Sequence, residues 1–497
     1  EAAERVTRAG LALPPELAAP RVRLEVAGGS AKASLQRLAL DPAEGRYVAQ
    51  ELEGLTLGAP VALPPGRYLA QVAWGDAPSR RVPVPFVARR GPPQALAVPR
   101  PALLARRWGW AEFAYVHPGR TYGGNGGDSQ VLDVPVEVAG FYAGRTEVLL
   151  EGWYAYRCAL GWPPAAQVPT GNKRARADGP LSPGLGRLPV ARVSADEVGR
   201  YLGWLRAELL RARVPLLLGL PTAEMYARAL RGPFRWLFPW GEAFDASFVA
   251  PEGALSPARS GPQDRSVFGV YDLVSSVAEF NKPASHLPVG TFSYTGGSFR
   301  ETWSNIVFSV TGVGLAPRDY RHDLLGFRVY ALEGVLPELE RDPARCAARR
   351  AEALRLAGLT DYLGAIREAT AAIDADPLDL EAWLIRGTAR LRLSDNWGAN
   401  FDGCRAVELD PESVDGWSLI ALAEDQRGLH ASSLEAWDRA LALRPRMADS
   451  YRMRAHVKAA LDDRAGALED LDQYERLAPA QHPMRDDADR LRAELGD

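Results

Sequence analysis

The chain has 497 residues, which at ordinary domain sizes corresponds to about three domains. Hydrophobic residues make up 47% of the chain and charged residues 24%, so a collagen-like or intrinsically disordered chain is excluded. The formal net charge is −3, and this balance gives no basic surface for nucleic acid or for an acidic membrane. We therefore expect neither of these partners.

The sequence predicts neither a membrane span nor a cysteine-based site. The longest apolar stretch, residues 214–221, is far shorter than the roughly 20 residues that cross a bilayer. Cys158, Cys346 and Cys404 are too few and too far apart for a disulfide framework or a zinc site. The chain opens with Glu1 and not with Met, so we interpret it as a mature or excised piece of a longer protein.

Short strands are predicted near the N-terminus, after a segment over residues 1–20. Residues 21–26 alternate apolar and polar side chains, as does the stretch after the Pro-Gly-Arg-Tyr turn at residues 65–68. These patterns predict a small β-sandwich over residues 21–91. With its Pro-Gly-x-Tyr turn it is similar to accessory modules beside bacterial surface and signalling domains, which implies a spacer. Prolines over residues 92–107 predict a stiff, extended linker.

Residues 108–332 have a different character, because Trp, Gly and Pro are frequent and regular periodicity is scarce. Two helices stand out. Ser194 and Glu197 form a capping box before apolar residues at helical spacing. Thr222 is the expected N-cap of a second helix, which ends near Arg231. The region is therefore predicted to be a loop-rich α+β domain.

Motifs recur along this domain in a definite order. They occupy residues 113–120, 141–148, 188–190, 220–222, 238–241, 268–280, 296–299 and 326–329. The last two read Gly-Gly-Ser-Phe and Gly-Phe-Arg-Val. In order and spacing the set resembles the formylglycine-generating enzyme (sulfatase-modifying factor) superfamily, whose fold is distantly related to C-type lectins. The resemblance implies a C-type-lectin-like α+β fold for residues 108–332.

The same resemblance implies that copper chemistry is missing. In the oxygen-using enzymes of the family two cysteines follow the Gly-Gly-Ser-Phe motif and hold copper, and here those positions are Glu301 and Ile306. Neither side chain supplies the thiolate that copper prefers, so we expect neither copper nor catalysis that depends on it. At the family's second calcium site Glu279 remains, but Ser276 replaces the asparagine ligand. Calcium at Glu279 is the alternative to a chain without any cofactor.

Non-catalytic members of this superfamily occur outside bacterial Ser/Thr kinases, joined to them through a small β-module. The order found here, a β-module, a linker and this domain, is similar to the extracytoplasmic half of such a receptor. The sequence contains no H-R-D, no D-F-G and no Gly-rich kinase loop. The compartment is therefore extracytoplasmic if the chain belongs to a kinase receptor, and cytoplasmic if it does not.

One stretch of this domain, residues 301–322, overlies the active cleft in the family and is the candidate ligand site. Its aromatic and polar side chains suit a pocket with a few converging polar groups. The candidates are Glu301, Trp303, Asn305, Arg318, Tyr320 and Arg321. The alternative interpretation is ordinary loop packing without a ligand.

A repeat occupies residues 344–482, after a linker over residues 333–343. The closing prolines are spaced by 34 residues, at Pro377, Pro411, Pro445 and Pro479. The aromatic residues that keep the same step are Trp383, Trp417 and Tyr451. A 34-residue period with an aromatic, a small residue and a closing proline resembles the tetratricopeptide repeat. It predicts an all-α solenoid of stacked helix pairs, with a capping helix over residues 483–497.

The first helix of each predicted repeat is expected to line the concave face of the solenoid. Basic residues recur there, and four are candidates for binding a partner: Arg386, Arg390, Arg454 and Lys458. Because arginine binds carboxylates through two parallel hydrogen bonds, an acidic peptide or protein is the expected partner. Changing Arg386 and Arg454 together to Glu would then abolish binding and leave thermal stability nearly unchanged. Glu424 interrupts the strip, and a solvated face without a partner is the alternative.

These features together favour a non-catalytic recognition protein. Its middle region would be a degenerate formylglycine-generating-enzyme-like domain, and its repeats would form a groove for a protein or peptide. One form of this hypothesis makes the chain the sensor half of a bacterial signalling receptor. The alternative is an oxidoreductase-type modifier of peptide or protein substrates that uses residues other than the family cysteines.

Overall fold

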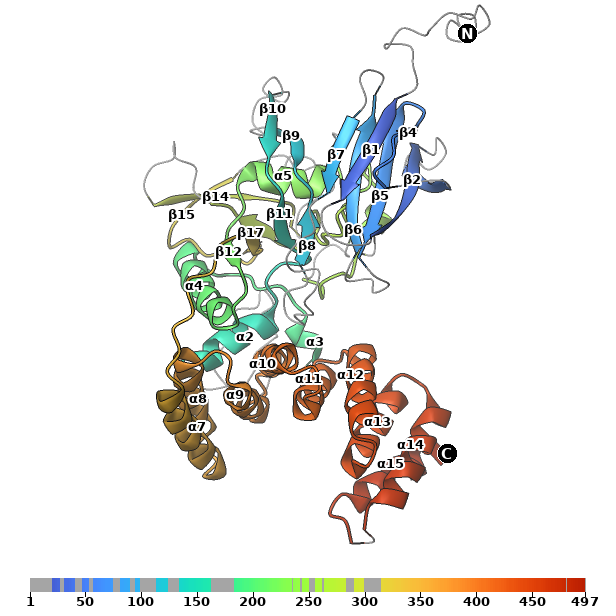
Figure 1. The fold of residues 1–497 in the computed structure, drawn as a ribbon. Helices are drawn as coiled ribbons and strands as arrows, with labels where there is room; N and C mark the ends of the chain where they lie inside the picture. Colours follow the sequence, from blue (N-terminus) through green and yellow to red (C-terminus); the bar gives the residue numbers. More distant parts are fainter. Residues whose placement is uncertain are drawn as a thin grey trace, which may run out of the picture.

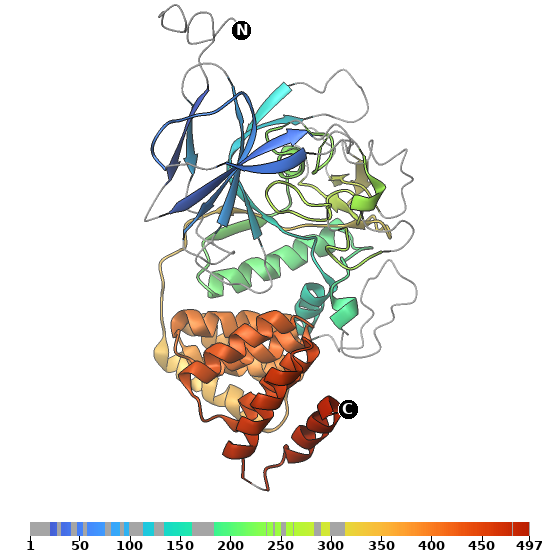
Figure 2. The ribbon, with the colours of Figure 1, turned by 90° about the vertical axis from the view of Figure 1, so that its right-hand side faces the viewer.

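The computed structural model has three regions that follow one another along the chain (Figures 1 and 2). A β-module (residues 20–98) and a middle domain (residues 113–333) lie side by side, and a helical stack (residues 343–496) lies against the middle domain. The described residues are 20–26, 31–40, 47–52, 57–74, 81–89, 94–98, 113–123, 134–161, 183–234, 236–241, 244–249, 255–261, 263–282, 290–298, 314–479 and 481–496. The prediction of an α+β chain that ends in a helical solenoid is confirmed.

The β-module consists of two small sheets. Its strands are β1 (Arg21–Val26), β2 (Lys32–Leu40), β3 (Tyr47–Leu52), β4 (Val61–Ala62), β5 (Gly66–Ala73), β6 (Arg81–Ala88) and β7 (Gln94–Val98). The sheet orders are β4-β1-β7 and β3-β2-β5-β6. Alternate residues of these strands are buried in one apolar core, among them Leu24, Tyr68 and Val72.

Strand β7 corrects the predicted linker over residues 92–107. It pairs in parallel with β1, with Val22 opposite Gln94 and Val26 opposite Val98. Val98 is buried in the core of the module. The prolines beside this segment hid a short alternating pattern, because a strand at the edge of a sheet tolerates proline at its ends.

The middle domain combines short strands with a few helices and many loops. Its first half contains β8 (Phe113–Val116), β9 (Gly119–Gly123), β10 (Val134–Val138), β11 (Phe141–Gly144), α2 (Leu150–Ala159), α3 (Pro183–Gly186) and α4 (Ala195–Arg211). Its second half contains β12 (Leu216–Gly219), α5 (Ala223–Arg231), β13 (Ala278–Phe280), β14 (Thr291–Thr295), β15 (Gly314–Pro317), β16 (Leu325–Gly326) and β17 (Tyr330–Glu333). The larger sheets have the orders β12-β17-β11-β8 and β15-β14-β13-β16.

Both predicted helix starts are confirmed. The Ser194 side chain accepts a hydrogen bond from the Glu197 backbone N–H, and the Glu197 carboxylate accepts one from the Ser194 N–H at 2.9 Å. Thr222 caps α5 by accepting from the Met225 N–H at 3.2 Å. These side chains satisfy backbone donors that the first turn of a helix leaves without partners.

The described residues from Pro343 onward form four helical hairpins and a final helix. The hairpins are repeat 1 (α7, Pro343–Gly358, and α8, Tyr362–Ala375), repeat 2 (α9, Leu380–Arg392, and α10, Asn396–Leu409), repeat 3 (α11, Val414–Gln426, and α12, His430–Leu443) and repeat 4 (α13, Ala448–Ala460, and α14, Arg464–Leu477). The final helix is α15 (Arg485–Gly496). Within the described ranges, no helix combines the length and the apolar character needed to cross a membrane.

A hydrogen bond explains why an aromatic residue and a proline share the 34-residue step. Trp383 Nε1 donates to the carbonyl oxygen of Pro377 at 3.0 Å, and Trp417 Nε1 donates to that of Pro411 at 2.9 Å. Tyr451 OH donates in the same way to a proline carbonyl. In repeats 2, 3 and 4 the aromatic residue of the first helix is therefore bonded to the turn that closes the preceding hairpin.

An apolar core joins the helical stack to the middle domain. Helix α2 packs on α10, and the rings of Trp204 (α4) and Trp397 (α10) lie 5.5 Å apart. A Cβ atom at Gly152 in α2 would lie 3.3 Å from Trp397 Nε1, so glycine permits this close approach. The two regions therefore share part of one core instead of meeting at a solvated surface.

Candidate functional site

The predicted ligand residues of the middle domain are only partly described. Glu301, Trp303 and Asn305, like Ile306, lie outside the described residues. Arg318 pairs with Asp196, and Arg321 Nη1 lies 2.5 Å from Glu197 Oε2. Both arginines therefore bind acidic side chains in the first turn of α4. Tyr320 stacks on His322 at the surface, with ring centroids 5.9 Å apart.

The side chains around Glu279 do not fit a calcium ion. Both Glu279 oxygens accept from Arg328 Nε, at 3.0 and 3.1 Å, and Oε1 also accepts from Arg328 Nη2 at 2.7 Å. A hard cation needs those oxygens for itself. Among the described residues no group of three His, Cys, Asp or Glu side chains could hold a metal.

Arg328 belongs to a buried cluster with four carboxyl groups, those of Glu147, Asp264, Asp272 and Glu279. It pairs with Glu279 at 2.7 Å and lies 3.8 Å from Glu147, whereas Asp264 interacts electrostatically with Glu147 and Asp272. Burial raises the pKa of Glu279 to about 7 although Arg328 opposes it, and burial raises that of Asp264 to about 6. The Asp264 carboxylate accepts from the backbone N–H of Leu273 and Val274, so it shapes the loop before β13. Asp272 and Glu279 are the two cluster residues that the motif at residues 268–280 supplies.

The three cysteines are buried thiols, and two of them are held in the protonated form. Cys158, Cys346 and Cys404 lie on α2, α7 and α10, outside any disulfide. Burial raises the pKa of the Cys158 and Cys346 thiols to about 12 in each case. A thiolate is the reactive form, and it is disfavoured at both positions at neutral pH.

Thiol titration tests this environment directly. We expect the native chain to react very slowly with Ellman's reagent at mildly alkaline pH, because the three thiols are buried and those of Cys158 and Cys346 stay protonated. The same chain unfolded in denaturant should release three equivalents at once. A rapid single equivalent from the native chain would contradict the assignment and indicate an accessible thiolate.

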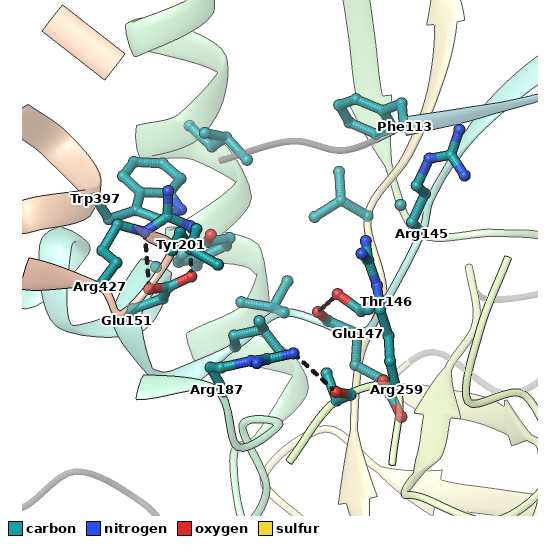
Figure 3. Close-up of a pocket in the computed structure, with 18 residues that line it drawn as sticks. Phe113, Arg145, Thr146, Glu147, Glu151, Arg187, Tyr201, Arg259, Trp397 and Arg427 are labelled. Carbon is teal, nitrogen blue, oxygen red and sulfur yellow. Dashed lines mark hydrogen bonds and ion pairs between the residues drawn. The ribbon is translucent and has the colours of Figure 1, made fainter. Parts of the chain in front are cut away.

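A cavity of about 130 Å³ lies where the middle domain meets the helical stack (Figure 3). Phe113, Tyr201 and Trp397 supply aromatic walls. The guanidinium groups of Arg145, Arg187 and Arg259 line another part of its wall (Figure 3). Because Trp397 comes from α10, the cavity exists only while the two regions are docked.

An ion pair at the cavity joins the same two regions. Arg427, which follows α11, donates to both oxygens of Glu151 in α2, at 2.7 and 3.0 Å. Its other terminal nitrogen donates to Glu424 at 2.7 Å. Glu424, which interrupts the predicted basic strip, thus takes part in docking repeat 3.

A second buried ion-pair network fixes repeat 2 to α4. Glu208 Oε2 accepts from Arg386 Nη2 at 2.9 Å and from Arg390 Nη2 at 3.4 Å, and Oε1 accepts from Arg211 Nη1 at 2.9 Å. Asp402 in α10 binds the same two arginines of α9 from the other side. Burial alone would raise the pKa of Glu208, but the guanidinium groups outweigh burial and lower it to about 2. Glu208 therefore remains ionised inside the junction.

Two of the four predicted partner-binding residues are therefore corrected. Arg386 and Arg390 have exposed fractions of 0% and 2%, so they face no open groove. For the change of Arg386 and Arg454 together to Glu we now expect a loss of thermal stability, because the Arg386 substitution would place another carboxylate beside Glu208 and Asp402.

The other two predicted residues, Arg454 and Lys458, lie at a pocket on repeat 4. Arg454 binds both oxygens of Asp470 at 2.6 and 2.8 Å, and its Nη1 donates to Asp438 at 2.7 Å. Lys458 Nζ lies 3.0 Å from Asp470 Oδ2 and donates to the Gly466 carbonyl oxygen. The pocket is lined by Tyr451, Arg454, Lys458, Glu469, Asp470, Asp472, Gln473 and Arg476.

Sequence reasoning missed the acidic side of the junction. Glu208 stands seven residues after Tyr201 and so lies on the apolar face of α4, where a charged residue needs a buried partner. This charged residue on an apolar helix face is the sequence signal that could have predicted a buried ion pair. Glu151 gave a weaker one, because the sequence offers no boundaries for α2 beyond a run of aromatic residues.

Comparisons with known proteins find similarity to solved structures, each over part of the chain. No family model and no curated protein matches the chain. Among solved structures, the first tetratricopeptide domain of Spaghetti (RPAP3) bound to an HSP90 peptide is 21% identical, covers 25% of this chain and 99% of its own, and has a TM-score of 0.25. MamA is 20% identical over 31% of this chain and 86% of its own, with a TM-score of 0.27. PvdO from Pseudomonas aeruginosa is 19% identical over 44% of this chain and 93% of its own, with a TM-score of 0.35.

Proposed function

We propose that this chain is a recognition scaffold in which the middle domain is a non-catalytic platform and the helical repeats bind another protein. One observation carries the proposal. The buried ion pairs to the middle domain engage repeats 2 and 3, whereas repeat 4 keeps Arg454 and Lys458 at a pocket open to solvent. Repeats 2 and 3 are thus held against the middle domain, and repeat 4 is available to a partner.

The chemistry of the middle domain supports a non-catalytic role. The positions of the family's copper ligands carry Glu301 and Ile306, and the buried cysteines lie on three separate helices. A degenerate formylglycine-generating-enzyme-like domain would use its buried charges for folding. Because its order of modules resembles that of kinase receptors, we propose that the chain serves as the sensor half of a bacterial signalling protein.

Site-specific photo-crosslinking in the cells that produce the chain tests the scaffold. A photoreactive amino acid replaces Gln473 at the repeat 4 pocket, and in a matched control it replaces Leu354 on α7, which is 55% exposed. We expect a discrete protein adduct at position 473 and none at 354. The captured protein, once purified, should bind the full chain with one-to-one stoichiometry.

Two results would overturn the proposal. One is the same set of adducts at both positions, which would indicate nonspecific collisions. The other is stoichiometric copper in the purified chain together with oxidation of a cysteine-containing sulfatase-motif peptide, which would make the chain an enzyme.

A further inference from the structure

Repeats 2 and 4 contain the same ion-pair arrangement, two repeat lengths apart. Arg386, Arg390 and Asp402 of repeat 2 stand at the positions of Arg454, Lys458 and Asp470 of repeat 4. In each repeat the arginine binds both oxygens of the aspartate through Nε and Nη2. The second cation of repeat 2, Arg390, donates to Asp402 and to a glycine carbonyl oxygen. The second cation of repeat 4, Lys458, lies 3.0 Å from Asp470 and also donates to a glycine carbonyl oxygen.

The surroundings of the two arginines also correspond. Arg386 stacks over Trp383 at 4.8 Å, and Arg454 stacks over Tyr451 at 5.5 Å. The Nη1 group of Arg386 donates to Thr370 of the preceding hairpin, and that of Arg454 donates to Asp438, its equivalent two repeats later. These are therefore two copies of one site.

The copies differ in what binds them from outside the repeats. In repeat 2 the Glu208 carboxylate accepts from both cations, so Arg386 and Arg390 are buried with three carboxylates, those of Glu208, Asp402 and Asp395, the last 3.6 Å from Arg390. In repeat 4 every described carboxylate paired with Arg454 or Lys458 belongs to the repeats themselves. Asp470 is buried, whereas the Asp438 side chain is 56% exposed and so binds Arg454 weakly.

We propose that repeat 4 binds a glutamate side chain on a helix of a partner protein, in the way that repeat 2 binds Glu208 on α4. This inference rests on the proposed scaffold function and names the chemistry of its partner. The pocket also contains two further carboxylates, of which Asp472 pairs with Arg492 at 2.6 Å. The other, Glu469, favours a helix on which basic residues accompany the glutamate, as Arg206 and Arg211 accompany Glu208 on α4.

The α4 sequence itself is the probe. A synthetic peptide of residues 194–212 is titrated into the full chain, and the Nε–Hε resonance of Arg454 is followed by NMR. We expect saturable binding, and we expect a Glu208→Gln peptide to bind about tenfold more weakly, because the charge-assisted hydrogen bonds are lost. In the chain, Lys458→Gln should weaken binding about tenfold, and Asp438→Asn should strengthen it by removing a competing carboxylate.

Matched controls make each outcome decisive. Arg444→Gln removes an exposed cation elsewhere on the stack and should leave the titration unchanged. Equal binding of the Glu and Gln peptides, or an Arg454 resonance that does not respond at millimolar peptide, would overturn the inference. If crosslinking at position 473 still captures a partner in that case, the scaffold proposal survives and only the carboxylate recognition fails.

Discussion

Replacing Glu208 by Gln is expected to lower the free energy of unfolding by about 3 kcal/mol and to detach the helical stack from the middle domain. Glu208 is the buried carboxylate that balances Arg386 and Arg390 from the side of α4. Without its charge, two cations stay buried with Asp402 and Asp395 as their remaining counter-charges, and Arg386 keeps only Asp402, so part of the desolvation is no longer offset. Chemical denaturation measures the loss, and limited proteolysis between residues 333 and 342 reports the detachment.

Glu381→Gln is the matched control for this change. Glu381 also pairs with an arginine, Arg350 at 3.0 Å, but its side chain is 63% exposed. We expect a change within about 0.5 kcal/mol, as for other surface ion pairs. Equal losses in the two variants would show that the Glu208 network does not hold the junction together.

Replacing Arg328 by Met is expected to unfold the middle domain at neutral pH, with a loss of about 4 kcal/mol or more. Arg328 is fully buried, pairs with Glu279, and donates to the carbonyl oxygens of Gly144 and Tyr271 at 3.0 and 2.9 Å. The substitution leaves the buried carboxylates without a cation. Near-ultraviolet circular dichroism follows the tertiary packing, and Arg318→Met removes an exposed arginine from the same domain as a control.

Acid should partly rescue the Arg328→Met variant, since a protonated carboxyl needs no counter-ion. Burial already raises the pKa of Asp264 to about 6 and that of Glu279 to about 7 in the native chain. A carboxyl whose pKa is higher in the folded chain than in the unfolded chain binds its proton more tightly when folded. Its contribution to stability is therefore complete below the unfolded pKa and is lost as the pH rises through 6 to 7. The stability of the variant is compared at pH 5 and pH 8, each about one unit outside the range of the two raised pKa values. Equal instability at both pH values would contradict the prediction.

Within the junction Glu208 should respond to pH in the opposite direction, unlike Asp395 and Asp402 of the same network, whose pKa values are raised by burial. The pKa of Glu208 falls to about 2 in the native chain, so its contribution is complete at neutral pH and is lost only as pH falls toward that value. Mild acid therefore protonates carboxyls of the Arg328 cluster while Glu208 stays ionised at the contact with the repeats.

The sequence predicted the elements whose signals are local. The 34-residue step and the Ser194 capping box depend on neighbours along the chain, and both appear in the structure as expected. Strand β7 escaped prediction because its pairing partner, β1, lies some seventy residues away. Local pattern carries no information about such a partner.

The accessibility of the basic residues also depends on a contact that is distant along the chain. Helical spacing placed Arg386 and Arg454 at equivalent positions, and they do make equivalent bonds within their repeats. Only the position of α4 separates them, since it covers one and leaves the other at a pocket. Equivalent residues in a repeat can therefore have different accessibility when a neighbouring domain covers part of the array.

Docking also changes the mechanics of the helical array. In a free solenoid each hairpin contacts only its neighbours, so the array bends like a spring along its whole length. Here the middle domain holds repeats 2 and 3, while α13, α14 and α15 extend away from it (Figures 1 and 2). We therefore expect a force applied to repeat 4 to bend the array mainly between repeats 3 and 4, where the ion pairs to the middle domain end.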